Sequence, residues 1–343
     1  MNDKKVAVLG AGPAGLAAAI TLAEMGLAVS LYEKSSEAGK KIRSNHNLFP
    51  DRISAKEVHK KLLKWLDHPM IRWIPDTQVI RLSRVSRSLK LETEKGTHDE
   101  FDAVIISTGF DFFDARLKEE FGFGIYERVI DSPGLETLFN SSKLPLTFNG
   151  KDPQTVAFVH CVGSRDSQSG INYCSRLCCI TGIKQAIQVK ELYPQCRVYN
   201  FYIDLRAGGR GYEELFREAQ EKYGIQFIRG RVSEAGENDH HRIVIKAEDT
   251  LMGRPLKVTT DWLVLLIGMV PCKSNIEFEP GNENTTGQDG FYQISRYMNS
   301  NRVDNQAGVY VAGSCCGPMN IPESIASGRS AAAEVFQYLK HQS

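Results

Sequence analysis

The first 160 residues of this 343-residue sequence contain no cysteine, because all eight cysteines lie in the remainder of the chain. Four of them fall between residues 161 and 179, two are adjacent at 315 and 316, and two stand alone. This distribution excludes a disulfide framework that staples the whole chain together. In a reducing compartment, grouped cysteines more often bind metal or carry out redox chemistry.

The sequence also lacks an excess of charge of one sign. It has 42 Lys and Arg residues and 41 Asp and Glu residues, which gives a net charge of +1. Binding driven by charge to nucleic acid or to an anionic membrane is therefore excluded as the main function. No apolar run approaches the roughly 20 residues of a membrane helix, and the N-terminus lacks a signal-peptide pattern. We expect a cytoplasmic protein without a membrane span.

A glycine motif of the form GxGxxG, made by Gly10, Gly12 and Gly15, lies between an apolar strand and an Ala-rich helix. The first glycine permits a tight turn, the second lets the backbone approach a pyrophosphate, and the third lets the helix pack closely on the strand. The N-terminus of the helix then faces the anion. Glu33 follows at the end of the next strand, where a carboxylate can accept hydrogen bonds from both ribose hydroxyls. This motif alone does not distinguish FAD from NAD.

Further features favour FAD. Gly39 and Lys41 follow Glu33 where two-domain flavoproteins wrap a pyrophosphate, and Thr108-Gly109 ends a strand as in those enzymes. One position departs from the flavoprotein pattern: Ser314 follows Gly313 where these proteins usually have an Asp that holds a ribityl hydroxyl, and here the serine or the backbone could serve. A helix beginning at Pro322 could direct its positive end at the flavin. The predicted FAD-binding residues are Gly10, Gly12, Pro13, Ala14, Gly15, Glu33, Lys34, Gly39, Lys41, Thr108, Gly109, Gly313, Ser314, Ile321, Pro322, Glu323 and Ser324.

Apolar runs of strand length alternate with helical segments, which predicts an α/β fold with two Rossmann-like, three-layer domains of the nucleotide-binding type. One βαβ pattern starts at residue 6 and a second at residue 155. The expected bounds are 1–112 and 273–343 for a discontinuous FAD-binding domain, 113–150 for a crossover, and 151–272 for a second Rossmann-like domain.

Four cysteines in the second predicted domain, Cys161, Cys174, Cys178 and Cys179, have the spacing C-x12-C-x3-C-C. Four thiolates are soft ligands that suit either zinc or an iron–sulfur cluster. The adjacent pair at 178 and 179 differs from the paired knuckles of a zinc ribbon, and the spacing differs from the common ferredoxin run. A cysteine also stands where a second dinucleotide-binding turn would open.

The chain resembles the A-type subunit of heterodisulfide reductases, which has a thioredoxin-reductase-like core. The resemblance covers most of residues 155–330 and is most specific at the YCSRxCC element of residues 173–179. Because the sequence starts directly at the glycine turn and lacks CxxCxxC runs, it is similar to the short form found in heterodisulfide-reductase-like complexes of sulfur-oxidising prokaryotes. Other matching segments are residues 161–166, 183–186, 204–206, 211–214, 227–232, 268–271 and 317–324.

This resemblance implies an oxidoreductase subunit with FAD and a [4Fe–4S] cluster, the latter held by Cys161, Cys174, Cys178 and Cys179. It places Lys184 beside the flavin ring. It implies electron transfer within a complex of cytoplasmic sulfur oxidation, with B- and C-type subunits and a lipoate-binding protein as partners, and we expect a homodimer.

The residues are also compatible with two other functions. One is an NAD(P)H-dependent flavin disulfide reductase whose four cysteines hold a structural zinc ion, and the other is a non-catalytic assembly scaffold. Cys315 and Cys316 are expected to be free thiols, because adjacent cysteines close only a small, strained disulfide ring.

Overall fold

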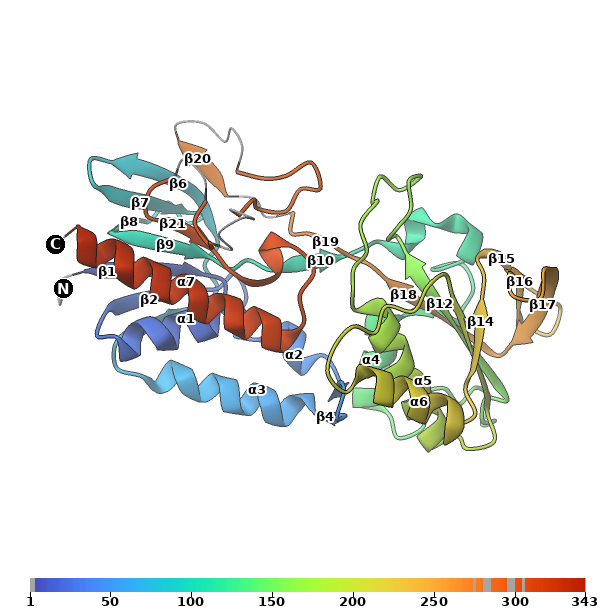
Figure 1. The fold of residues 1–343 in the computed structure, drawn as a ribbon. Helices are drawn as coiled ribbons and strands as arrows, with labels where there is room; N and C mark the ends of the chain where they lie inside the picture. Colours follow the sequence, from blue (N-terminus) through green and yellow to red (C-terminus); the bar gives the residue numbers. More distant parts are fainter. Residues whose placement is uncertain (1–3, 274–275, 280–284, 295–299, 304–305, 343) are drawn as a thin grey trace. The chain divides into compact units, whose positions relative to one another are not determined.

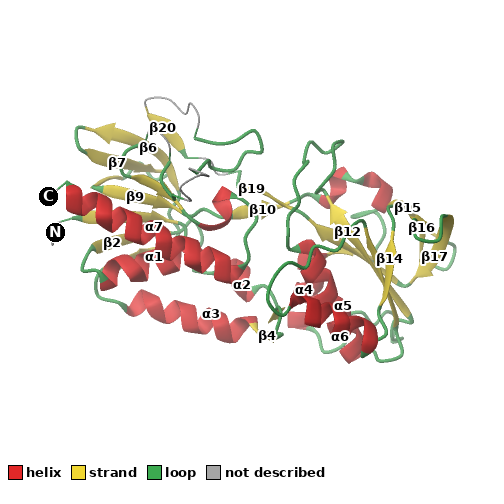
Figure 2. Ribbon diagram, in the orientation of Figure 1, coloured by secondary structure: helices red, strands yellow, loops and turns green. Residues whose placement is uncertain are grey.

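The computed structural model describes residues 4–273, 276–279, 285–294, 300–303 and 306–342 (Figure 1). It divides into two compact units. Unit 1 comprises Met1–Arg43, Lys56–Asp111 and Val270–Ser343, and unit 2 comprises Ser44–Ala55 and Phe112–Met269. Each unit is an α/β structure with its own parallel sheet (Figure 2). The predicted fold class, two Rossmann-like domains, is confirmed.

The centre of unit 1 is a five-stranded parallel sheet in the order β21-β9-β1-β2-β5. Alternate residues of β1 point to opposite faces of this sheet. Val6 and Val8 pack with the helices, whereas Ala7 and Leu9 pack with an antiparallel layer of strands. The strands are β1 (Lys5–Leu9), β2 (Ala28–Tyr32), β5 (Ile71–Ile74), β9 (Ala103–Ile106) and β21 (Val309–Val311).

Helices cover one face of this sheet, and a second sheet of order β20-β6-β7-β8 covers the other (Figure 1). Helices α1 and α7 approach closely because Gly328 has no side chain: a Cβ there would lie 2.1 Å from the Ala14 carbonyl oxygen. The helices are α1 (Pro13–Glu24), α2 (Lys40–Arg43), α3 (Ala55–Leu63) and α7 (Ile321–His341). The added strands are β6 (Val79–Val85), β7 (Ser88–Thr93), β8 (His98–Phe101) and β20 (Glu277–Glu279).

Unit 2 repeats the parallel arrangement with the order β11-β18-β12-β13-β14. Both β12 and β18 are buried along their whole length, as expected of central parallel strands. The elements are β11 (Val129–Asp131), α4 (Ser132–Ser141), β12 (Thr155–Val162), α5 (Cys178–Leu192), β13 (Arg197–Tyr202), α6 (Tyr212–Glu221), β14 (Gln226–Arg229) and β18 (Trp262–Ile267).

Smaller sheets complete the fold. An antiparallel sheet contains β15 (Val232–Glu237), β16 (Ile243–Asp249) and β17 (Arg254–Thr260). Two-stranded sheets are formed by β3 (Asn47–Leu48) with β4 (Ile53–Ser54), and by β10 (Phe110–Phe112) with β19 (Met269–Pro271). Of the described helices, none has both the length and the apolar character that crossing a membrane requires.

Candidate functional site

The glycine turn of unit 1 has the conformation that the motif predicts. Gly10 adopts a φ of 103°, and a Cβ there would lie 2.5 Å from the Ser107 carbonyl oxygen. A Cβ on Gly15 would lie 1.8 Å from the Gly10 carbonyl oxygen, so only glycine fits. A Cβ on Gly12 would meet nothing within 4 Å, which leaves open space beside the turn. The backbone can therefore be approached closely at Gly12, as a pyrophosphate requires.

Helix α1 offers an anion-binding end at this turn. Its N-cap residue is Gly12, which provides no capping side chain, and its first turn contains Pro13 and no acidic residue. The N–H groups of a first helical turn lack intrahelical partners and carry partial positive charge. Ser107 holds the turn from below, since its hydroxyl donates to the carbonyl oxygens of Leu9 at 3.0 Å and Gly10 at 2.9 Å. This role of Ser107 was not predicted from the sequence.

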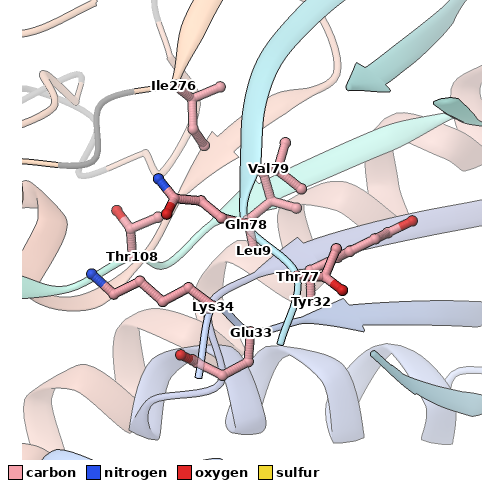
Figure 3. Close-up of a pocket in the computed structure, with 10 residues that line it drawn as sticks. Leu9, Tyr32, Glu33, Lys34, Thr77, Gln78, Val79, Thr108 and Ile276 are labelled. Carbon is pink, nitrogen blue, oxygen red and sulfur yellow. The ribbon is translucent and has the colours of Figure 1, made fainter. Parts of the chain in front are cut away.

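Glu33 follows strand β2 and is tied to the glycine turn. Its carboxylate accepts hydrogen bonds from the Ala11 N–H at 2.8 Å and from the Ser35 N–H at 3.1 Å. Glu33, Lys34, Gly10 and Thr108, all predicted, line one pocket (Figure 3). The sequence reasoning missed the other lining residues, which are Leu9, Tyr32, Thr77, Gln78, Val79 and Ile276.

The loop that carries Gly39 and Lys41 also packs on the turn, because the Gly39 N–H donates to the Ala11 carbonyl oxygen at 2.9 Å. The Lys41 ammonium lies 4.4 Å from the centre of the Phe110 ring and 3.7 Å from the Asp111 carboxylate. Burial lowers the pKa of Lys41, although the charge of Asp111 opposes this effect. Gly109, at the end of the predicted Thr108-Gly109 element, has a positive φ of 76°.

The C-terminal predicted residues surround the start of α7. Gly313 has a φ of 75°, and a Cβ there would lie 2.5 Å from the Ala14 Cβ, so the two predicted segments meet. Helix α7 starts at Ile321, one residue before the predicted Pro322, because the Asn320 side chain caps it. Glu323 takes part in this cap, since its carboxylate accepts from the Asn320 N–H at 2.9 Å. The Ser314 hydroxyl donates to the Met319 carbonyl oxygen at 3.4 Å, and Ser324 is buried.

Three of the four clustered cysteines meet in unit 2. Cys161 is the next-to-last residue of β12, and Cys178 and Cys179 are the first two residues of α5. Hydrogen bonds link the thiol of Cys178 to those of Cys161 and Cys179. Cys174 lies in the loop of residues 163–177, and both Cys174 and Cys161 are near enough to act electrostatically on Arg165.

The surroundings of Cys161 and Cys179 favour the thiolate, whereas those of Cys178 favour the thiol. The hydrogen bond from Cys178 lowers the pKa of Cys161 to about 7 and that of Cys179 to about 4, whereas the same contacts raise the pKa of Cys178. His160 adds to the effect on Cys179. A helix N-terminus also stabilises thiolate charge. Backbone N–H groups face two sulfurs, that of Arg206 at 3.5 Å from Cys179 and that of Arg176 at 3.3 Å from Cys174.

Backbone strain marks the same region. Cys161, Arg165 and Arg176 have φ values of 62°, 56° and 60°, which residues with side chains rarely adopt. Such conformations persist where the surroundings fix them, often at functional sites. In the part of the chain that the structure describes, no three His, Cys, Asp or Glu side chains are arranged to hold a metal ion. The residues present thus fit a metal centre by the chemistry of their ligand atoms. Sulfur is a soft ligand, and backbone N–H groups lie beside two of the sulfurs.

Two buried serines connect the loops that bear the cysteines. The Ser164 and Ser175 hydroxyls lie 2.9 Å apart, and the Ser175 N–H donates to the Ser164 hydroxyl at 3.0 Å. The Met269 N–H donates to the Ser175 hydroxyl at 2.9 Å. These contacts join the segment after Cys161 to the segment after Cys174. They were not predicted, because hydroxyl pairing across a loop leaves no periodic signal in the sequence.

Lys184 lies inside unit 2, with only 2% of its side chain exposed. Its ammonium contacts the Glu136 carboxylate at 2.6 Å and the Asn47 carbonyl oxygen at 2.8 Å. Glu136 also accepts from the Gln185 amide at 2.6 Å and the His46 N–H at 2.7 Å. This ion pair was not foreseen, and the predicted place of Lys184 beside a flavin stays a prediction. Cys315 and Cys316 are free thiols with sulfurs 3.8 Å apart, in accordance with expectation.

Comparison with known proteins adds three findings. Residues 4–138 match the family of pyridine nucleotide-disulphide oxidoreductases. The chain is 39% identical over 242 residues to the second A-type iron–sulfur subunit of CoB–CoM heterodisulfide reductase from Methanopyrus kandleri. This match covers 68% of the chain and 37% of that protein. It is 30% identical to the A-type subunit of a ferredoxin/F420H2-dependent CoB–CoM heterodisulfide reductase from Methanosarcina acetivorans, over 98% of the chain and 53% of that protein.

Among solved structures, thioredoxin reductase of T. acidophilum is similar with a TM-score of 0.67 and 20% identity, covering 99% of this chain and 100% of that one. The enzyme of Lactococcus lactis gives a TM-score of 0.68 with 16% identity and the same coverage. These likenesses concern the fold. The chain spans about half or less of the length of the curated relatives that it matches. These sequence relatives show that the chain belongs to the family of A-type subunits of heterodisulfide reductase.

Proposed function

We propose that this chain is an oxidoreductase subunit that transfers electrons between FAD, bound in unit 1, and a [4Fe–4S] cluster, bound in unit 2. One observation carries the proposal: the thiols of Cys161, Cys178 and Cys179 meet at the N-terminus of α5, where a dinucleotide-binding fold would hold a phosphate. A protein with a nicotinamide site would need that helix end for its cofactor. A chain with thiols there has exchanged a nucleotide ligand for a metal ligand.

In unit 1, the open space beside Gly12 and the unpaired N–H groups of α1 would hold the pyrophosphate of FAD. Glu33 would accept hydrogen bonds from the ribose hydroxyls, and Lys34 and Thr108 line the same pocket. Gly313 would leave room beside Ala14, and α7, whose first turn contains Pro322 and Ser324, would direct its positive end at the cofactor.

In unit 2, Cys161, Cys174, Cys178 and Cys179 would be the four ligands of the cluster. FAD exchanges one or two electrons and the cluster one, so together they would join donors of electron pairs to single-electron carriers. The protein contributes burial of Cys161, Cys178 and Cys179, which excludes water from their sulfurs. The N–H groups of Arg206 and Arg176 would stabilise the negative charge of Cys179 and Cys174.

The proposed setting is a heterodisulfide-reductase-like complex of cytoplasmic sulfur oxidation, with B- and C-type subunits, a lipoate-binding protein and a second copy of this chain as partners. The names of the curated relatives, which are components of heterodisulfide reductases, support a role as one of several subunits.

Anaerobic purification followed by flavin, iron, zinc and acid-labile sulfide analysis tests this proposal. We expect one FAD and about four iron and four sulfide per chain. Cys178→Ser should lose iron and sulfide and keep its flavin, because serine is a poor ligand for the cluster. Cys196→Ala, which removes a buried cysteine elsewhere in unit 2, is the matched control and should keep its iron.

Other outcomes would contradict the proposal. Yellow protein with zinc and no iron would favour the NAD(P)H-dependent disulfide reductase. Colourless protein that binds its partners would favour the scaffold. Wild-type iron content in Cys178→Ser would show that the cysteine ligands are misassigned.

A further inference from the structure

Basic side chains gather beside the cysteines, at the carboxyl ends of three neighbouring strands. Strands β12, β13 and β14 are adjacent and parallel, so the segments that follow them share one edge of the sheet. Arg165 follows β12, Arg206 follows β13, and Arg229 ends β14, with Arg231 two residues later. In open parallel sheets, this edge is where ligands bind.

Two of these arginines, Arg165 and Arg229, form hydrogen bonds with one carboxylate, that of Asp204. Arg165 contacts its carboxylate at 2.8 Å and Arg229 at 3.4 Å. The Arg231 guanidinium donates to the Arg165 carbonyl oxygen at 3.1 Å. The hydrogen bond from Arg165, followed by the charges of Arg229 and Arg206, lowers the pKa of Asp204, which shows that Arg206 also lies close. Three arginines thus act on the single Asp204 carboxylate, and Arg231 lies beside Arg165.

This basic patch, defined as Arg165, Arg206, Arg229 and Arg231, is both exposed and adjacent to the thiols. Arg206, Arg229 and Arg231 are exposed, and about half of the Arg229 side chain is open to solvent. The Asp204 carbonyl oxygen lies 3.6 Å from the Cys179 sulfur, and the Arg206 N–H lies 3.5 Å from it. One short loop therefore separates the patch from the proposed cluster.

We propose that this patch is the docking surface for an acidic protein that exchanges electrons with the cluster. Exposed arginines steer an acidic partner toward their own location and hold it there by charge complementarity. Docking at this loop would bring the partner next to Cys179 and so shorten the path for an electron. The inference rests on the proposed function, which supplies the cluster.

A nucleic acid is the less favoured occupant. The patch contains four arginines, the whole chain has almost no net charge, and nucleic-acid binding draws on many phosphate contacts. A dinucleotide is also disfavoured, because the long loop of residues 163–177 replaces a short phosphate-binding turn between β12 and α5.

The test compares two charge reversals in the cluster-loaded full-length chain. Arg229→Glu with Arg231→Glu changes the patch charge by four, and Lys151→Glu with Arg197→Glu makes the same change at exposed positions near the amino ends of β12 and β13. The probe is a purified acidic [2Fe–2S] ferredoxin, and its dissociation constant is measured by calorimetry at 20 mM and 0.5 M salt. A single-stranded oligonucleotide is measured in parallel.

For the patch variant we expect ferredoxin binding at least about tenfold weaker at low salt, with the difference lost at 0.5 M salt, where charges are screened. The Lys151→Glu, Arg197→Glu variant should differ less than about twofold from the wild type. Equal losses in both variants, no binding by the wild type, or tighter binding of the oligonucleotide would each overturn the inference. Iron analysis of the same samples separates the two proposals. Wild-type protein without iron would contradict the proposed function. An unchanged ferredoxin affinity in the iron-loaded Arg229→Glu, Arg231→Glu variant would contradict the docking surface.

Discussion

Replacing Lys184 by alanine should destabilise unit 2 strongly, because it leaves the Glu136 carboxylate buried without its counter-charge. The two side chains are 2% and 5% exposed, and their charged atoms lie 2.6 Å apart. Breaking such a pair by removing one partner costs about 3–5 kcal/mol. In a domain of 150–250 residues, each kcal/mol lowers the Tm by roughly 2–4 °C, so the expected loss is about 6–20 °C.

The ion pair of Lys184 and Glu136 contributes less to the free energy of unfolding than this loss suggests. Replacing both partners by apolar residues of similar size removes both buried charges, and such replacements are often neutral or stabilising. Lys184→Met combined with Glu136→Leu should therefore recover much of the Tm that either single change loses. The Gln185 amide and the His46 N–H, which also bond to Glu136, would lose an acceptor and limit this recovery.

Thermal and urea unfolding of the wild type, both single variants and the double variant form a double-mutant cycle that measures this coupling. Fluorescence and circular dichroism are followed together, because two units can unfold in separate steps. A Lys184→Ala stability within 1 kcal/mol of the wild type would refute the reasoning. The flavin reduction potential of the double variant then tests the predicted place of Lys184 beside the flavin, since only that role shifts the potential downward.

Two further predictions concern the nucleotide sites. Glu33→Ala should weaken FAD binding by about 10- to 150-fold, the equivalent of 1.5–3 kcal/mol for hydrogen bonds to a charged group, when flavin release is titrated in the purified protein. Glu57→Ala, at an exposed position of α3, should bind FAD like the wild type, and an unchanged Glu33→Ala would remove Glu33 from the site. NADH and NADPH should not bleach the flavin in anaerobic stopped-flow mixing, because unit 2 has no short glycine turn between β12 and α5. Fast, saturable bleaching would favour the pyridine-nucleotide reductase instead.

Much of the fold follows from local sequence signals. The βαβ patterns expected from residues 6 and 155 are present as β1-α1-β2 and β12-α5-β13, because short apolar runs define buried parallel strands. Helix α4 was not predicted, because residues 113–150 were expected to be a crossover. The helix contains Pro133 and Gly134, which weaken a helical pattern, and the Asp131 side chain that caps it leaves only a short-range signal.

The candidate site was predictable where a motif is local and not where a contact is distant. The glycine turn and Glu33 lie within one βαβ unit, and the structure gathers them at one pocket. Ser107 and Glu136 support site residues from segments far along the chain, and hydrogen bonds of this kind depend on the packed fold. No periodicity or spacing marks them, so only the structure reveals their partners.

The N-terminus of α5 can stabilise either a phosphate or a thiolate. In a nucleotide-binding unit, the free N–H groups and positive end of such a helix stabilise a phosphate. The same field stabilises thiolates, and here Cys178 and Cys179 occupy the first two positions of the helix. The loop of residues 163–177 carries Cys174 and is fastened by the pair Ser164 and Ser175. A parallel sheet that keeps its strand order can thus present thiols in place of a phosphate-binding turn, by lengthening one loop and placing sulfur where phosphate would bind.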